Sequence, residues 1–195
     1  MKIGKHELLK IVMKSIYPDL DDKAFDYFTL GLSTVKLKSK EEFNSPCSKQ
    51  VKIGFINVGL VKGYYIDKDG NEVNTRFMCE GNFVADYKSF ISQEPSRYYF
   101  KAIEPTTLLV FNYNHVQDCY ANFPSFQIFG RKLAESVIVK LDSRLESQHF
   151  YDAATRYLHF VNEYPNLAKR LSLEDVASYI RITRPSLSRL KNKLS

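Results

Sequence analysis

Side chains that can hydrogen-bond to bases and phosphates recur near the C-terminus, between Ser172 and Leu194. Arg donates to guanine or to phosphate oxygens, whereas Ser, Thr and Asn pair with base edges or with the sugar-phosphate backbone. Seven candidates for such contacts to DNA are Arg181, Thr183, Arg184, Ser186, Ser188, Arg189 and Asn192. They can act together only if a helix presents them on one face.

Apolar spacing in this segment predicts two short helices that meet at a sharp turn. The residues at the shared seam are Val176, Ile180, Ile182, Leu187 and Leu190, with small Ala177 where the helices touch. In the second helix Leu187, Leu190 and Leu194 follow at i, i+3 and i+7, so Arg184 and Arg189 turn outward. An amphipathic pair that packs on another surface is the alternative.

Start signals support both helices. Ser172 stands three residues before Asp175, where its hydroxyl can cap the first helix. Thr183 can cap the second helix, and Pro185 lies in its first turn, where a missing amide proton costs little. The segment therefore predicts a helix-turn-helix whose second helix enters the major groove.

The segment VASYIRITRPSLSRLKNKL resembles the DNA-binding end of CRP/FNR transcription regulators, in particular the divergent branch of Bacteroidetes-type bacteria. The upstream segments GLVKGYYIDKDGNEVNTRF, EGNFVADYKSFISQEPSRYYFKAIEPTTLLVF and YPNLAKRLSLEDVASY resemble that branch in the same order, so the resemblance covers roughly residues 20–195. It implies a transcription regulator that binds double-stranded DNA as a homodimer. An activator of this kind would also contact RNA polymerase, but the sequence does not distinguish an activator from a repressor.

Two positions depart from the family pattern. Arg181 stands in the turn where the family often has Gly, and a positive φ there costs a non-Gly residue about 1 kcal/mol. Pro185 replaces an acidic or polar residue that can read a base. The family's target sequence therefore does not transfer to this chain.

Charge placement agrees with DNA binding. From Pro165 to Ser195 seven Lys and Arg residues oppose Glu174 and Asp175, which gives +5 of the total net charge of +6. Such a basic segment supplies the salt-sensitive attraction to phosphates. The other reading, a solubilising tail, does not require apolar residues in helical register.

Cysteine and histidine spacing predicts no metal site and no cofactor. Cys47, Cys79 and Cys119 lie more than 30 residues apart, and an iron-sulfur cluster needs four cysteine ligands. The four His residues also lack close ligand spacing. We therefore expect plain thiols and no enzyme; a metal-dependent β-barrel enzyme would need His and carboxylates clustered on adjacent strands.

Short strands are predicted from Val35 to about Tyr113, with a hairpin turn at Asp67–Asn71, after helices that fill residues 1 to about 33. The spacing suggests a barrel or a sandwich. By resemblance it is a cyclic-nucleotide-binding-like β-roll, a double-stranded β-helix. The predicted fold class is therefore α+β, and the helix-turn-helix has a short or absent wing.

The resemblance places an effector site within Glu80–Ala102. Its candidate residues are Gly81, Phe83, Ala85, Asp86, Ser96 and Arg97. Gly81 and Phe83 match the family, but Ala85-Asp86 replaces Gly-Glu, and Ser96-Arg97 reverses the order of Arg and hydroxyl residue. We therefore disfavour cyclic nucleotide binding and expect either a lost site or a different effector.

One apolar stripe without proline predicts a helix at residues 125–148, about 35 Å long. Its members are Phe126, Phe129, Leu133, Val137, Leu141 and Leu145. The stripe could pack on the β-roll of its own chain. By resemblance, it instead pairs two subunits and places their two DNA-binding domains about 34 Å apart. Residues 1–124 would sense the effector, 125–148 would dimerise, and 149–195 would bind DNA, with a helix at Phe150–Asn162 ended by Pro165.

The N-terminus shows no signal peptide, and no apolar run approaches the ~20 residues that a membrane span needs, so we expect a cytoplasmic protein. Composition is ordinary for a globular chain, with 44% hydrophobic and 26% charged residues. The leading hypothesis is a sequence-specific DNA-binding regulator. The alternative is a cyclic-nucleotide-binding signalling module that acts through protein contacts.

Overall fold

The computed structural model of the chain describes residues 6–49 and 51–194. It contains two compact units. The first comprises the described residues up to Gly63 and Phe77–Ser136, and the second comprises Tyr64–Arg76 and the described residues from Val137 onward. The predicted segments 1–124, 125–148 and 149–195 were defined by sensing, dimerisation and DNA binding. Because the fold alone does not test these roles, the division stays a prediction.

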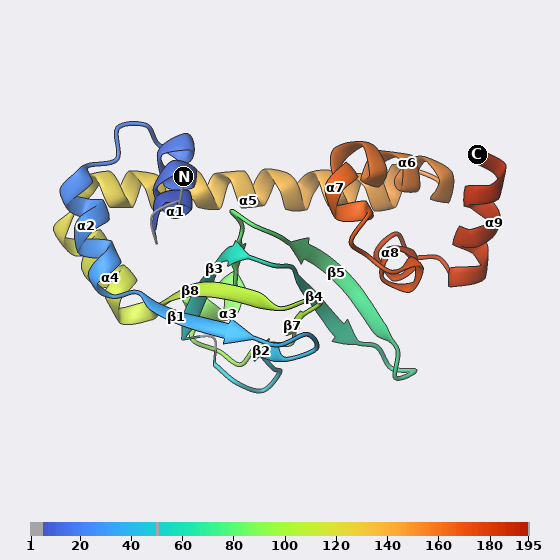
Figure 1. The fold of residues 1–195 in the computed structure, drawn as a ribbon, viewed down its shortest axis with the longest axis horizontal. Helices are drawn as coiled ribbons and strands as arrows, with labels where there is room; N and C mark the ends of the chain where they lie inside the picture. Colours follow the sequence, from blue (N-terminus) through green and yellow to red (C-terminus); the bar gives the residue numbers. More distant parts are fainter. Residues whose placement is uncertain (1–5, 50, 195) are drawn as a thin grey trace. The chain divides into compact units, whose positions relative to one another are not determined.

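Eight strands build two four-stranded sheets (Figure 1). Their bounds are β1 Ser33–Leu37, β2 Glu42–Asn44, β3 Lys52–Val58, β4 Val61–Ile66, β5 Glu72–Met78, β6 Phe83–Val84, β7 Tyr99–Ala102 and β8 Thr106–Asn112. The sheet orders are β1-β8-β3-β6 and β2-β7-β4-β5, and β8 runs antiparallel to both β1 and β3. The predicted β-roll and the α+β class are confirmed.

The interior of the roll is an apolar core to which both sheets contribute. Ile56, Leu108 and Val110 come from one sheet, and Phe100 and Ala102 come from the other. Because these side chains pack in one cluster, the two sheets face each other across it. The buried members of this core all come from strands.

A second core covers the opposite face of the β1-β8-β3-β6 sheet. Phe55 and Phe111 pack there with Phe28, Phe126 and other helical residues. Since β3 and β8 are covered on both faces, both contain runs of buried residues in place of strict alternation.

Four helices of the first unit are α1 Glu7–Ile16, α2 Asp22–Leu30, α3 Tyr87–Ser92 and α4 Tyr113–Asn122. The first two confirm the predicted N-terminal helices over the described residues; Met1–Lys5 lie outside them. Sequence reasoning missed α3 and α4. The α3 helix has only six residues, and α4 is rich in Tyr, Asn and His, which have modest helix propensity.

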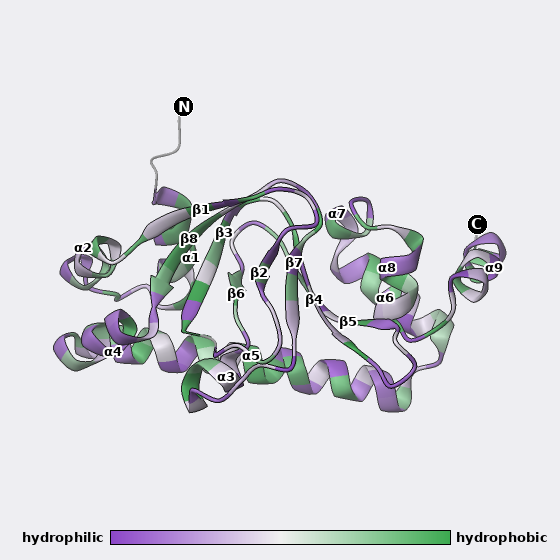
Figure 2. Cartoon of the chain, turned by 90° about the horizontal axis from the view of Figure 1, so that it is seen from below, coloured by the Kyte–Doolittle hydropathy of each residue, from purple (hydrophilic) through white to green (hydrophobic). Residues whose placement is uncertain are grey.

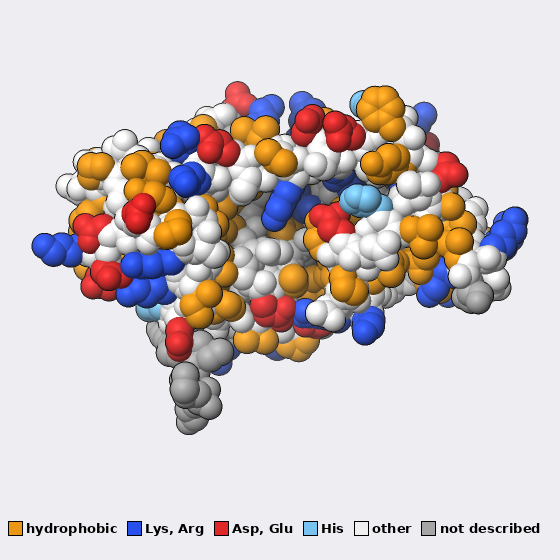
Figure 3. Space-filling view, turned by 90° about the horizontal axis from the view of Figure 1, so that it is seen from above, with side chains coloured by type: hydrophobic (Ala, Val, Ile, Leu, Met, Phe, Trp, Pro, Cys, Tyr) orange, Lys and Arg blue, Asp and Glu red, His pale blue; other side chains and the backbone are white. Residues whose placement is uncertain are grey.

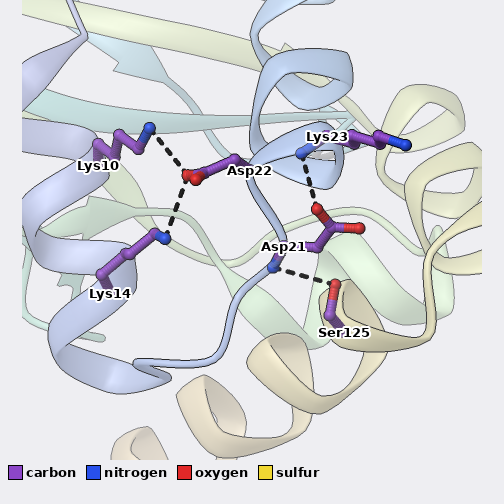
Figure 4. Close-up of polar contacts among 6 residues, drawn as sticks. All are labelled: Lys10, Lys14, Asp21, Asp22, Lys23 and Ser125. Carbon is purple, nitrogen blue, oxygen red and sulfur yellow. Dashed lines mark hydrogen bonds and ion pairs between the residues drawn. The ribbon is translucent and has the colours of Figure 1, made fainter.

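Polar contacts join α1 and α2 to each other and to the long helix α5, Pro124–Phe150 (Figure 4). Lys10 and Lys14 of α1 both pair with the Asp22 carboxylate, at 2.9 and 3.1 Å. Asp21 caps α2 by accepting from the Lys23 amide, and its own amide donates to Ser125 Oγ at 3.4 Å. These contacts hold the helical layer over the second core.

The long helix α5 extends from Pro124 to Phe150 and confirms the prediction for residues 125–148. Within the first unit Phe126 and Phe129 are buried, and Gly130 lies so close to Tyr120 that a Cβ would be 2.3 Å from the phenol oxygen. This part of the predicted stripe therefore packs on its own unit, which was the alternative that the sequence left open.

Further along α5 the apolar side chains are not covered. Ile138, Leu141 and Leu145 are 64%, 47% and 52% exposed, and they are spaced like the a and d positions of a coiled coil. Green segments recur along α5 in Figure 2. The predicted stripe included Leu141 and Leu145 but omitted Ile138.

The second unit continues with α6 Ala153–Glu163, α7 Pro165–Ala168, α8 Leu173–Tyr179 and α9 Arg184–Leu194. The prediction that α6 starts at Phe150 is wrong, because α5 includes that residue and Asp152 caps α6 by accepting from the Thr155 amide at 2.8 Å. Pro165 lies at the start of α7. No helix in the described part of the chain is both long and apolar enough to span a bilayer.

Candidate nucleic-acid interface and effector cassette

The helix pair α8–α9 has the predicted start signals. The Asp175 amide donates to Ser172 Oγ at 3.0 Å, and the Ser186 amide donates to Thr183 Oγ1 at 3.3 Å. Pro185 is the second residue of α9, where no intrahelical amide bond is lost. Both caps were correctly predicted.

Between the helices the backbone turns at Arg181, whose φ is 58°. The Arg181 amide donates to Ser178 O at 3.2 Å, and the Ile182 amide donates to Ala177 O at 3.0 Å. This is the Schellman pattern, in which a left-handed residue closes a helix C-terminus. The predicted positive φ at a non-Gly residue is confirmed, and it places the Arg181 side chain in solvent.

The seam between the two helices contains most of the predicted apolar residues. Val176, Ala177, Ile180 and Leu187 are almost fully buried. Ile182 and Leu190 are partly buried, whereas Leu194 is 46% exposed. The seam nevertheless fixes which side of α9 faces outward.

All seven predicted DNA-contact residues are exposed. Arg184, Ser188 and Arg189 are exposed on α9; Arg189 lies opposite the buried Leu187, and Arg184 and Ser188 lie at the side of it. Thr183 and Ser186 are partly engaged, since their hydroxyls lie 2.9 Å apart in the cap. The free donors of this surface are therefore mainly guanidinium groups, which suit phosphates and guanine edges.

The first residues of β5, in the β4–β5 hairpin, support α8, a feature that the sequence did not reveal. The Asn74 amide donates to Ser178 Oγ at 2.9 Å, and Ser178 Oγ donates to Glu72 O at 2.9 Å. The Asn74 side chain is 3% exposed and donates to Asp175 O and Oδ1, both at 3.2 Å. The hairpin therefore positions the first helix of the pair.

Arg144 of α5 contacts the same junction. Its guanidinium carbon lies 3.7 Å from the Tyr179 ring centroid, and its Nη2 donates to Tyr179 O at 3.2 Å and Asn74 O at 3.4 Å. Burial lowers the pKa of Arg144 and raises the pKa of Tyr179. Such stacking on a partly desolvated ring is a favourable cation–π contact.

The predicted effector residues lie around β6 and α3 in the first unit. Gly81 has a φ of 82°, and its amide donates to Ile56 O at 2.9 Å. The Phe83 ring packs against Phe55 and Phe111, and Ala85 packs at the edge of the same core. Gly81, Phe83 and Ala85 therefore each make contacts within the fold that need no effector to explain them.

Asp86 and Ser96 lie together, and Arg97 does not join them. The Asp86 carboxylate, 6% exposed, caps α3 by accepting from the Ser89 amide at 3.4 Å and also accepts from Ser96 Oγ at 2.9 Å. Ser96 Oγ also accepts from the Tyr98 amide at 3.0 Å. Arg97 is exposed to solvent. A carboxylate thus occupies the helix start where an anion would be attracted.

Cys119 is the cysteine that lies beside a histidine in the described part of the chain. Cys119 Sγ lies 3.8 Å from His115 Nε2, but burial raises the pKa of the Cys119 thiol to about 11, so it stays protonated at neutral pH. Cys47 is exposed and Cys79 is partly buried. Within residues 6–49 and 51–194 no three His, Cys, Asp or Glu side chains converge as metal ligands would.

Comparison with known proteins assigns the roll and the fold. The family described as cyclic nucleotide-binding domain matches residues 47–123. A comparison with curated protein sequences finds no match.

Three solved structures illustrate the similarity of fold. FixK2 from Bradyrhizobium japonicum has a TM-score of 0.72 at 16% identity, covering 84% of this chain and 84% of that one. A regulator classed in the CRP/FNR family, from Eubacterium rectale, has a TM-score of 0.71 at 11% identity, covering 91% and 85%. The c-di-GMP responsive regulator CLP from Xanthomonas campestris has a TM-score of 0.68 at 15% identity, covering 89% and 91%. Residues 47–123 therefore match the cyclic nucleotide-binding domain family, and the chain has the fold of the CRP/FNR transcription regulators.

Proposed function

We propose that the protein is a homodimeric transcription regulator that binds specific sites in double-stranded DNA, and that it acts in the cytoplasm. The observation that carries this proposal is the exposed face of α9. Arg184, Ser188, Arg189 and Asn192 are exposed on a helix whose inward side is fixed by the buried Leu187. A helix of this kind fits the major groove, and arginines at its start can read guanine or hold phosphates.

Two subunits are needed because one short helix reads only half of a palindromic site. The uncovered residues Ile138, Leu141 and Leu145 of α5 provide a seam for pairing with the same residues of a second copy. Exposure of three large apolar side chains at coiled-coil spacing is otherwise unfavourable.

For the roll we propose that cyclic AMP and cyclic GMP are not its effectors. The Asp86 carboxylate would repel the cyclic phosphate at the start of α3, and Ser96 already donates to that carboxylate. Arg97 would have to turn inward from solvent to compensate. The roll then serves as a scaffold or binds a different effector.

DNA binding is tested by selecting duplexes from a random pool and measuring their affinity at several salt concentrations. We expect the Arg184→Ala plus Arg189→Ala double variant to lose at least tenfold in affinity and, for each phosphate contact removed, about 0.9 in the slope of log K against log salt. Lys23→Ala plus Lys36→Ala is the matched control, because it removes two exposed cations that lie in the first unit. Equal losses in both variants, or no selected site, would contradict the proposal.

Ligand binding by the roll is tested by calorimetry with cyclic AMP, cyclic GMP and cyclic di-GMP. We expect no saturable heat for the two cyclic mononucleotides. Micromolar binding of either one, abolished by Arg97→Ala, would show that Arg97 reaches the ligand and that the reading of Asp86 is wrong.

A further inference from the structure

A cavity of about 120 Å³ lies within the second unit, between the C-terminal half of α5, α6 and the end of α8. Its lining includes Arg144 and Lys140 of α5, Arg156 of α6 and Tyr179 of α8. Sites for drug-sized ligands have several hundred Å³, so this cavity has room only for a few waters or one small ion.

Arg144 is a partly buried cation of this cavity, and among the described residues no ion pair joins it to a carboxylate. Its partners are two backbone carbonyls and the Tyr179 ring. The cations that act on it electrostatically are Arg76 and Arg181, which repel it. A partly desolvated cation with like charges nearby is stabilised by any anion that reaches it.

Further donors line the same cavity. Arg156 donates through Nε to Ile180 O at 3.0 Å and through Nη1 to Tyr151 O, which leaves Nη2 for a further partner. The Lys140 side chain is exposed and also lines the cavity. The lining contains one carboxylate, Glu163, which lies 3.3 Å from His159 Nδ1 and is thus already paired when that imidazole is protonated. Three cations therefore surround a space with little negative charge.

We propose that this cavity binds a small oxyanion, a phosphate or a carboxylate group, between Arg144, Arg156 and Lys140. Guanidinium groups bind such oxyanions through paired, charge-assisted hydrogen bonds. The anion would link α5 to α6 and, through Tyr179, to α8, at the base of the helix pair. An effect of the bound anion on DNA affinity depends on the DNA-binding function proposed above. Binding of the anion itself does not depend on that function.

The test titrates the full-length protein with inorganic phosphate and separately with acetate, by calorimetry at constant ionic strength. We expect saturable phosphate binding with a dissociation constant of about 1 mM or tighter. Lys140→Gln and Arg156→Gln should each weaken it about tenfold, as loss of one charge-assisted bond does. Lys169→Gln removes the same charge outside the cavity and should have little effect. Tighter binding of acetate than of phosphate would identify a carboxylate as the ligand class.

Arg144→Gln is a further cavity variant and should also weaken phosphate binding. Its result is interpreted only if circular dichroism shows native helix content. Arg184→Ala plus Arg189→Ala separates this site from the DNA-reading face and should leave phosphate binding intact. Equal weakening in the cavity variants and in Lys169→Gln would show unspecific attraction and overturn the site, as would no saturable binding of either anion. If the cavity variants weaken phosphate binding but the protein selects no DNA duplex, the anion site is supported and the proposed DNA-binding function is contradicted.

Discussion

The seam on α5 allows a quantitative prediction for Ile138→Ala, Leu141→Ala and Leu145→Ala combined. Burying a whole Leu or Ile side chain contributes about 2 kcal/mol, and roughly half of each of these is exposed. Pairing two copies would therefore gain about 1 kcal/mol per side chain, or about 6 kcal/mol over both subunits. The triple variant should raise the dissociation constant of the dimer by about 10⁴-fold, because each 1.4 kcal/mol is tenfold.

Sedimentation equilibrium over a wide range of protein concentration measures this change. Ala is the best helix former, and the replaced side chains are largely exposed, so the helix content of the monomer should persist. Val139→Ala is the matched control, because Val139 is as exposed as Ile138, at 64%, but points about 100° away around the helix. A triple variant that associates like the parent protein, or a parent protein that is monomeric at tens of micromolar, would refute the reasoning.

Three further outcomes are expected. Gly59→Ala should destabilise the roll by about 2–4 kcal/mol in urea denaturation, because Gly59 has a φ of 113° and a Cβ would lie 2.7 Å from Thr106 Cα. Gly70→Ala controls for the backbone strain alone and should cost less, because Gly70 has a φ of 83° but nothing within 4 Å of its Cβ position. Asn74→Ala should speed hydrogen exchange in α8 through the loss of two bonds to Asp175, worth about 1–3 kcal/mol, and unchanged exchange would contradict the role of the hairpin. The Asp22 pKa is held below its ordinary 3.8 by hydrogen bonds to Lys10 and then Lys14, so this contribution to stability is present above that pH and is lost as the pH falls through the lowered pKa. Asp22→Asn should be less stable near neutral pH and lose less stability on acidification, as followed by circular dichroism.

Local signals explain which parts of the fold were predictable from the sequence. Ser172, Thr183 and Pro185 act within one helical turn, so their residue types alone locate the two helices. The Asp67–Asn71 turn is equally local, because Asp67 Oδ1 accepts from the Asp69 and Asn71 amides, both at 2.9 Å. Such contacts need no knowledge of the distant chain.

Long-range contacts were not predictable. Asn74 contacts Asp175 across 101 residues, and nothing near Asn74 in the sequence marks it as a support for α8. Arg144 looks like an ordinary charge on an amphipathic helix until Tyr179 is placed against it. The start of α6 was misplaced because an uninterrupted apolar pattern hides the break that Asp152 makes. These features depend on packing, which residue periodicity does not specify.

The membership of Tyr64–Arg76 in the second unit limits how the chain can be divided. A fragment that begins at Val137 lacks the segment that satisfies Ser178 and Asp175, so it should be a poor autonomous domain. A chimera that exchanges only the C-terminal part with a related regulator would join α8 to a foreign hairpin. Modular exchange in this architecture therefore requires two separate segments, transplanted together.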